Sequence, residues 1–181
     1  RKFSWFLEAA GKTNEAIKNA EGKLVDEAGS VIYTSLAFSQ KGLGLTGQFK
    51  RTENYILRTS PNETLLNGVL DYIPPMARQN SLRLPARYQP ATQYLGELAY
   101  SLDAVYTPAK SYTTEGSFSY ITDLDNNHLW TEVYGQLEVT KNKKFNYLFG
   151  AQYVFYNQQV YLSEPLPNQT AITPFVELTF K

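Results

Sequence analysis

The side chains best suited to chemistry lie in one short run, which holds Asp123, Asp125, Asn126, Asn127 and His128. Closely spaced carboxylate and amide oxygens are the ligands that calcium prefers in proteins. The run lacks the glycine and the distant glutamate of an EF-hand loop, and Asp and Asn side chains also make the hydrogen bonds of tight turns. We therefore interpret the run as a hairpin turn and predict no metal site.

His128 is the one histidine of the sequence, and its closeness to Asp123 and Asp125 suggests a hydrolase built on an Asp and His pair. Such an enzyme needs a nucleophile or an activated water held by further partners. The sequence offers neither a serine-centred elbow nor a second histidine, and it has no cysteine. We therefore predict that the protein is not an enzyme, that it holds no cofactor, and that His128 lies at a strand end.

A second set of polar side chains recurs within long stretches whose other face is apolar. The members predicted to face the interior of the fold are Lys50, Glu97, Asp103, Glu132, Gln136, Glu138 and Gln152. In a pore, rings of such charges set ion selectivity. In a barrel of eight strands the interior is just wide enough for side chains, so opposite charges can instead pair and fill it, which is the interpretation we favour.

The clearest of these stretches is 93–107, in which apolar and polar side chains alternate with a period of two, as in a β-strand. Strands of soluble proteins most often have about five or six residues, whereas a tilted strand that crosses a bilayer needs roughly 9 to 11. The length therefore favours a membrane strand. The side chains predicted to face lipid or a partner protein are Tyr94, Leu98, Tyr100, Leu102, Leu137, Phe149 and Phe180.

The same alternation predicts about eight strands in one domain over residues 1–181. Besides 93–107, the predicted strands are 3–11, 31–39, 45–52, 117–122, 129–140, 145–155 and 170–181, with tight turns at 40–44 and 141–144. We expect 13–29 to be a polar loop with a short helix. The prolines in 60–90 exclude a regular central strand there and predict an irregular segment.

Composition agrees with an all-β, antiparallel, transmembrane outer-membrane β-barrel of about eight or more strands, either complete or part of a larger barrel. The 14 Tyr, 10 Phe and 2 Trp suit the aromatic girdles of such proteins. No window is as apolar as a transmembrane helix, and 17 basic against 17 acidic residues give no patch for nucleic acid. The first residue is Arg1, and we expect the sequence to be a piece of a longer protein.

Four short motifs carry a resemblance to a known family. They are SQKGLG at 39–44, KRTEN at 50–54, DYIPP at 71–75 and ARYQPATQ at 86–93. The sequence resembles an outer-membrane barrel family of the Bacteroidota known only as a domain of unknown function. The resemblance implies an outer-membrane location and a longer chain, and it transfers no active-site residue.

These observations predict a non-enzymatic outer-membrane barrel that acts as a structural or accessory subunit of a larger complex. Its expected partners are the lipid bilayer and other outer-membrane proteins. A passive diffusion pore for small solutes is the alternative. Alternation alone does not say which face is inside, so a soluble lipocalin-like ligand-binding barrel also stays open, although so many aromatic rings fit a lipid-facing wall better than a narrow interior.

Overall fold

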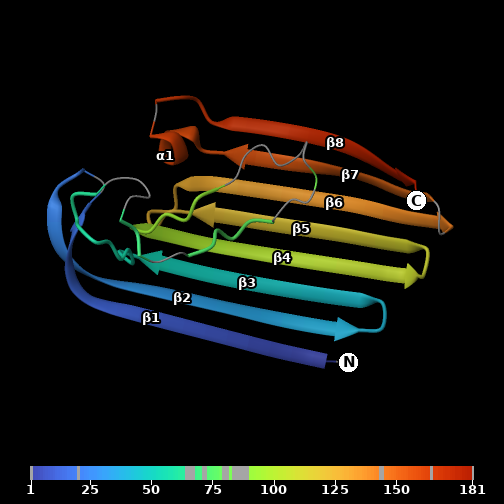
Figure 1. Cartoon of the computed structure of the whole chain (residues 1–181), viewed down its shortest axis with the longest axis horizontal. Helices are drawn as coiled ribbons and strands as arrows, with labels where there is room; N and C mark the ends of the chain where they lie inside the picture. The colour runs from blue at the N-terminus through green and yellow to red at the C-terminus, as the bar shows by residue number, and fades with distance from the viewer. Residues whose placement is uncertain are drawn as a thin grey trace.

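The fold is a single antiparallel sheet of eight strands, seen in a computed structural model that describes residues 2–19, 21–63, 68–70, 73–78, 82, 90–142, 145–163 and 165–180. Each strand pairs with the next one along the chain (Figure 1). The strands are β1 (Lys2–Lys18), β2 (Leu24–Gln40), β3 (Leu43–Glu53), β4 (Gly96–Ala109), β5 (Tyr112–Thr122), β6 (His128–Asn142), β7 (Phe145–Tyr156) and β8 (Gln169–Phe180), and one short helix, α1 (Gln158–Leu162), precedes β8. The predicted all-β antiparallel fold is confirmed.

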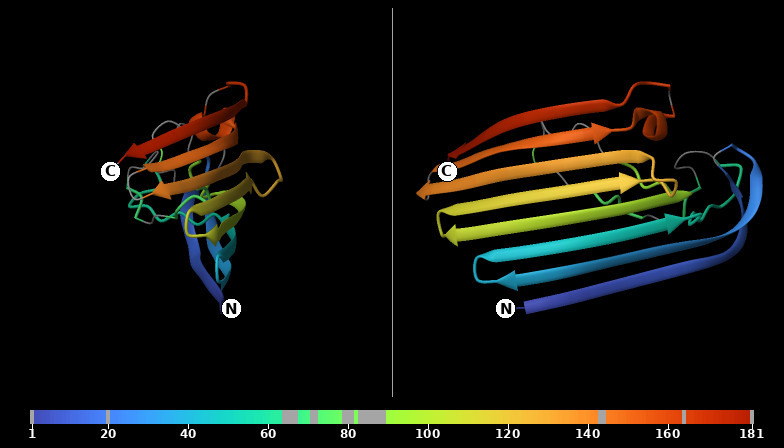
Figure 2. Two further views of the ribbon diagram at one scale, coloured as in Figure 1. Left: turned by 90° about the vertical axis from the view of Figure 1, so that its right-hand side faces the viewer. Right: turned by 180° about the vertical axis from the view of Figure 1, so that it is seen from behind.

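The sheet is open, and this corrects the expectation of a closed barrel. β1 and β8 form its two edges, and no ladder joins them among the described residues (Figure 2). The sheet does not close because a stretch of chain that includes residues 73–78 runs across the strands on one side of it. An eight-stranded barrel has room inside for side chains only, so the sheet cannot curl onto itself around this backbone.

The predicted end of the first strand and the predicted start of the second were wrong because a β-bulge interrupts the alternation. β1 continues to Lys18 and β2 begins at Leu24, so most of the predicted loop at 13–29 is strand. The register of this pair shifts between Lys12 and Glu15, and a bulge of this kind changes which side chains share a face. The short turn at 19–23 is closed by Asn19, whose Oδ1 accepts the N–H groups of Glu21 and Lys23.

The two ends of the sheet differ in their connections. At one end, which we call the short-turn end, residues 41–42 and 110–111 join neighbouring strands; residues 143 and 144 of the predicted turn lie outside the described part. At the opposite loop end the connections are residues 19–23, 54–95, 123–127 and 157–168. No helix in the described part of the chain is long and apolar enough to cross a membrane.

The turn at 123–127 uses its own polar side chains. Asp123 Oδ1 accepts the N–H groups of Asp125 at 3.0 Å and Asn127 at 2.8 Å, and Asn127 Nδ2 donates to Asp123 Oδ2 at 2.7 Å. Asn126 has a positive φ of 65°, which Asn tolerates well in turns. Both oxygens of the Asp123 carboxylate therefore accept hydrogen bonds within the turn.

Because side chains alternate along each strand and every strand pairs with the next, the side chains of the sheet separate into two faces. The polar face, which the crossing chain covers, carries Lys50, Thr52, Glu97, Ser101, Asp103, Glu115, Ser117, Ser119, Glu132, Gln136, Glu138 and Gln152. The apolar face carries Phe3, Trp5, Leu36, Phe49, Leu98, Tyr100, Leu102, Phe118, Val133, Leu137, Phe149, Tyr153, Ile172, Val176, Leu178 and Phe180.

The hydrophobic core is small and lies between the polar face and the crossing chain. It consists of Met76, Ala99, Ile121, Leu129, Trp130, Val154 and Tyr156. In the predicted strand 129–140, Leu129 shares the period of two with Leu137, which predicts it on the apolar face. The register shifts beside it, however, and the structure buries it in this core. From α1, Tyr161 stacks on Tyr156 with ring centroids 4.9 Å apart. Burial raises the pKa of Tyr161, so its phenol stays neutral.

Candidate functional site

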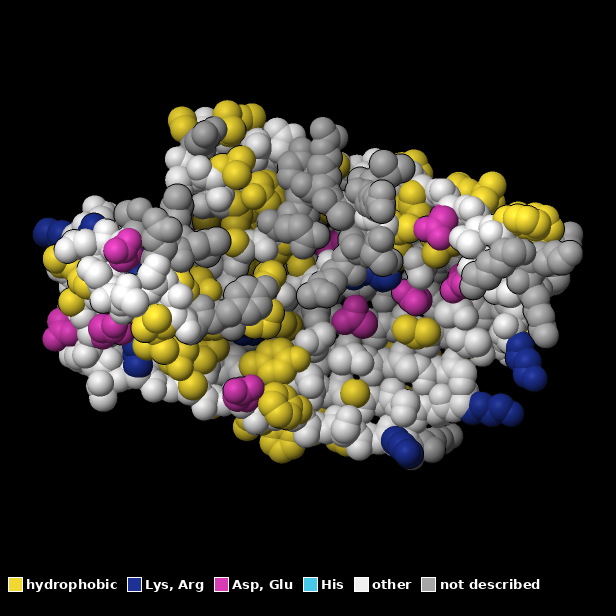
Figure 3. Space-filling view, viewed as in Figure 1, with side chains coloured by type: hydrophobic (Ala, Val, Ile, Leu, Met, Phe, Trp, Pro, Cys, Tyr) yellow, Lys and Arg dark blue, Asp and Glu magenta, His cyan; other side chains and the backbone are white. Residues whose placement is uncertain are grey.

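The polar face brings together all seven side chains predicted to face the interior. Lys50 comes from β3, Glu97 and Asp103 from β4, three others from β6 and Gln152 from β7. Four of them, Lys50, Glu97, Glu132 and Gln152, are buried. Figure 3 shows this side of the molecule, with acidic side chains among the polar ones beside the chain that crosses the sheet.

Lys50 and Glu97 form a buried ion pair that holds the crossing chain. Lys50 Nζ lies 2.8 Å from Glu97 Oε1, and the two side chains are 2% and 0% exposed. The same Nζ donates to Pro74 O and to Thr92 Oγ1, both at 2.9 Å. The ammonium group therefore donates two hydrogen bonds and has the Glu97 carboxylate as its ion-pair partner. The other Glu97 oxygen accepts the N–H of Gln93 at 2.8 Å.

Arg78 makes the second attachment of the crossing chain. Its Nη2 lies 3.0 Å from Glu115 Oε2, and its guanidinium carbon lies 3.8 Å from the centre of the Tyr134 ring. Its backbone N–H donates to Glu132 Oε2 at 3.3 Å. Gln152 Nε2 donates to the other oxygen of Glu132. The Glu132 carboxylate is thus shared between the sheet and the crossing chain.

These contacts define an inner segment, residues 73–78, which is fastened to the polar face at both ends. Met76, between the attachments, is 7% exposed and belongs to the core. The buried charges of the polar face are therefore paired or hydrogen-bonded by the protein itself, as buried charges must be. Within the described residues no group of three or more acidic or histidine side chains could hold a metal ion.

The other three predicted polar residues, Asp103, Gln136 and Glu138, lie nearer the short-turn end, and Asp103 lines a small cavity together with residues 75–78 of the inner segment. Gln48 Nε2 lies 3.4 Å from Asp103 Oδ2, Asn146 Nδ2 donates to Glu138 at 2.6 Å, and the Tyr134 hydroxyl donates to Gln136. The first two bonds join neighbouring strands and the third lies within β6, and all three predicted side chains remain partly exposed.

Sequence reasoning missed Arg78, Thr92 and Glu115, which complete the two attachments. Arg78 and Thr92 lie in or beside the proline-rich segment, where no periodicity assigns a direction to a side chain. Glu115 preceded the predicted start of its strand at 117, whereas β5 begins at Tyr112. The continued alternation Thr113, Glu115, Ser117 and Ser119 was the signal that could have found it.

Six of the seven side chains predicted to face lipid or a partner lie on the apolar face: Leu98, Tyr100, Leu102, Leu137, Phe149 and Phe180. Tyr94 is the exception and corrects the prediction, because it precedes β4 and accepts the N–H of Tyr55 within the loop region. His128 begins β6, and its ring stacks between Tyr120 and Phe155.

The apolar face is exposed along its whole width. Trp5 on β1 is 64% exposed, Leu102 on β4 is 54% exposed and Ile172 on β8 is 76% exposed. Among the described side chains of β3 to β8, the charges on this face are Arg51 and Glu53, which pair at 2.7 Å near the loop end. A monomeric soluble protein rarely exposes so large an apolar patch.

The chain belongs to DUF6029, a family of unknown function, whose model matches residues 1–181. This confirms the predicted membership of a family without assigned function, while the bacterial group and the outer-membrane location stay predictions. No curated protein and no solved structure matches the chain.

Proposed function

We propose that this member of DUF6029 forms part of the wall of an outer-membrane β-barrel, without enzymatic activity. In this proposal it is a structural or accessory component of a larger outer-membrane assembly, and its inner segment occludes the lumen. The observation that carries the proposal is the contrast between an apolar face exposed over all eight strands and a polar face covered by the chain itself.

Which face of the sheet is covered and which is exposed supports a membrane wall rather than a soluble ligand-binding barrel. A lipocalin-like barrel turns its apolar side chains toward a central cavity and its polar ones toward water. Here the covered face holds an ion pair and several carboxylates, whereas the aromatic and aliphatic rows face outward. Outward apolar bands and polar interiors are the arrangement of outer-membrane barrels.

The apolar band runs obliquely across the strands, as a membrane slab crosses tilted strands. On β2 it runs from Ile32 to Phe38 and ends before Gln40. On β8 it begins at Ile172, which the ladders place level with Leu36, and runs on to Phe180. The centre of the apolar band thus shifts by about five residues between β2 and β8, which corresponds to strands tilted by roughly 30° from the perpendicular to the band. Strands of membrane barrels are tilted by about 35–45°.

The connections support one orientation in the membrane. Outer-membrane barrels have short periplasmic turns and longer extracellular loops. We therefore assign the loop end, with residues 54–95 and 157–168, to the outside of the cell. The short-turn end then faces the periplasm.

The two free edges imply that the barrel has more than these eight strands. An unpaired backbone N–H or C=O group costs several kcal/mol in hydrocarbon, so open sheet edges do not occur there. β1 and β8 are unpaired on their outer sides in the described structure, and the inner segment prevents them from meeting. We therefore propose that further antiparallel strands pair with both edges.

A passive pore is the second candidate, and the open sheet is the observation that favours it. The prediction of a self-filling lumen relied on a narrow eight-stranded barrel, and a wider barrel removes that argument. Occlusion now rests on the inner segment, which two buried attachments hold across the polar face. We rank the occluded, accessory role first because releasing the segment would leave Lys50 and Glu132 without these partners.

The two tryptophans allow a direct test, because they lie on opposite faces. Trp5 is 64% exposed on the apolar face, and Trp130 is 1% exposed on the polar face, where its Nε1 donates to Ser119 Oγ. Trp130→Phe leaves Trp5 as the fluorophore and Trp5→Phe leaves Trp130. In vesicles of brominated phosphatidylcholine we expect strong quenching of Trp5 and little quenching of Trp130. Quenching of neither would argue for a soluble protein, and the reverse pattern for an inverted wall.

A further inference from the structure

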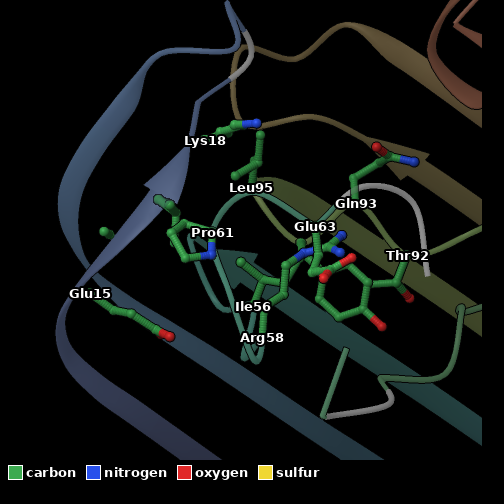
Figure 4. A pocket seen from close by; sticks show the side chains of 12 residues that line it. Glu15, Lys18, Ile56, Arg58, Pro61, Glu63, Thr92, Gln93 and Leu95 are labelled. Atoms are coloured by element: carbon green, nitrogen blue, oxygen red, sulfur yellow. The ribbon is translucent and has the colours of Figure 1, made fainter. Parts of the chain in front are cut away.

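A pocket of about 320 Å³ opens at the loop end (Figure 4). Its lining includes Thr92, whose hydroxyl donates to Ile73 O of the inner segment. The end of β1, the residues after β3 and the residues before β4 line it. We infer that this pocket binds a small zwitterionic ligand, of the class of an amino acid or a short peptide. The inference goes beyond the proposed function and does not depend on membrane insertion.

The pocket is held in shape by specific local features. The bulge between Lys12 and Glu15 re-aims the end of β1, and in Figure 1 the β1–β2 hairpin curls at this end of the sheet. Bulges often lie beside functional sites for this reason. Lys12 Nζ then donates to Ile56 O at 2.8 Å and pairs with Glu15 at 2.7 Å, which ties the strand to the loop.

Gly29 on β2 allows the close approach that this arrangement needs. A Cβ at this position would clash with Asn54 O and would lie 2.9 Å from Lys12 Cε. Asn54 itself has a positive φ of 47° and donates its N–H to Leu95 O. The loop residues on both sides of the pocket are thus fixed to the sheet.

The lining presents both signs of charge around an apolar floor. Its cations are Lys18 and Arg58, and its carboxylates are Glu15 and Glu63. Figure 4 shows Lys18 from β1 on one side of the pocket and Arg58 and Glu63 from the loop on another. The apolar lining comes from Ile17, Ile56, Pro61 and Leu95.

The charges identify the ligand class. Glu15 is already paired with Lys12, and in the described part of the chain no ion pair involves Lys18 or Glu63. A ligand with only one charge would satisfy one of these two groups. A zwitterion places its carboxylate at Lys18 and its ammonium group at Glu63, and the apolar floor accommodates a small aliphatic side chain. The volume lies in the range of small-molecule sites, about 300–1,000 Å³.

The test is calorimetric titration of the detergent-solubilised protein with the dipeptide Ala-Leu and its two blocked forms. N-acetyl-Ala-Leu lacks the ammonium group, and Ala-Leu-amide lacks the carboxylate. We expect the dipeptide to bind and each blocked form to bind about tenfold or more weakly, because each loses a charge-assisted hydrogen bond. This comparison uses the unmodified protein and does not depend on how a variant folds.

Two variants test which side chain binds which charged group of the dipeptide. Lys18→Gln should weaken Ala-Leu binding about tenfold and abolish the difference between Ala-Leu and its amide, while Glu63→Gln should abolish the difference made by acetylation. Lys23→Gln and Glu21→Gln, in the nearby turn and outside the lining, should change nothing. Absence of Ala-Leu binding, equal binding of all three compounds, or selective binding of maltose in place of the dipeptide would overturn the inference.

Discussion

The polar and apolar faces of the sheet differ in whether the chain supplies their partners. On the polar face, Lys50 and Glu97 are almost completely buried and satisfied by the inner segment and its neighbours. On the apolar face, large side chains on every strand remain exposed. The side chains of the polar face therefore have their partners within this chain, and we call this the satisfied face. The apolar face needs an apolar surrounding that the chain does not provide, and we call it the unsatisfied face.

The largest expected loss of stability comes from the buried ion pair of the satisfied polar face. Glu97→Gln removes one partner of a buried ion pair and leaves the Lys50 ammonium group, whose side chain is 2% exposed, without its carboxylate. Breaking such a pair costs about 3–5 kcal/mol, so we expect a loss of that size in the free energy of unfolding, measured by urea titration in micelles. Glu53→Gln, in the exposed pair with Arg51, should cost at most about 1 kcal/mol. Equal losses would show that burial does not distinguish the two pairs.

The second prediction concerns a charge placed on the unsatisfied apolar face. Leu102→Lys places a charge in the apolar band, which costs about 2–4 kcal/mol at the bilayer midplane. We expect a loss of stability of this size for protein folded in vesicles, read from urea-dependent tryptophan fluorescence. Ser101→Lys is the matched control on the neighbouring position of the polar face and should cost about 1 kcal/mol. A greater loss for the control would reverse the two faces.

The third prediction releases the inner segment at its second attachment. Arg78→Ala removes the ion pair with Glu115 and the contact with the Tyr134 ring, and one hydrogen bond to a charged group contributes about 1.5–3 kcal/mol. Hydrogen exchange at 73–78 should accelerate about tenfold or more, and vesicles holding the assembled barrel should become more permeable to small sugars. Arg78→Lys keeps the charge and should restore part of the protection. Unchanged exchange would mean that Arg78 does not fasten the segment.

The smallest expected effect comes from replacing the whole ion pair. Lys50→Met together with Glu97→Met removes both charges and keeps similar volumes, and such replacements are often neutral or stabilising. We expect the double variant to unfold at a urea concentration close to that of the unmodified protein. A loss as large as that of Glu97→Gln alone would show that the hydrogen bonds to Pro74 and Gln93 hold the segment more than the charges do.

The sequence predicted the central strands well because their alternation is uninterrupted. β4, β6 and β7 lie where alternating side chains placed them, and seven of seven candidate polar residues share one face. The prediction failed at Leu129 and at 13–29, because a bulge shifts the period of two and no single residue type marks it. The attachments of Arg78 and Thr92 were not predictable, since they depend on how an irregular segment folds across distant strands.

The most direct test of the account is labelling along β4, one residue at a time. The chain has no cysteine, so single cysteines at positions 98 to 103 each provide one thiol in protein reconstituted in vesicles. Positions 98, 100 and 102 should react with a maleimide confined to the lipid phase, and 99, 101 and 103 should not, which gives a period of two. Uniform protection, uniform reaction with an aqueous maleimide, or the opposite alternation would contradict a polar inner face and a lipid-facing apolar face.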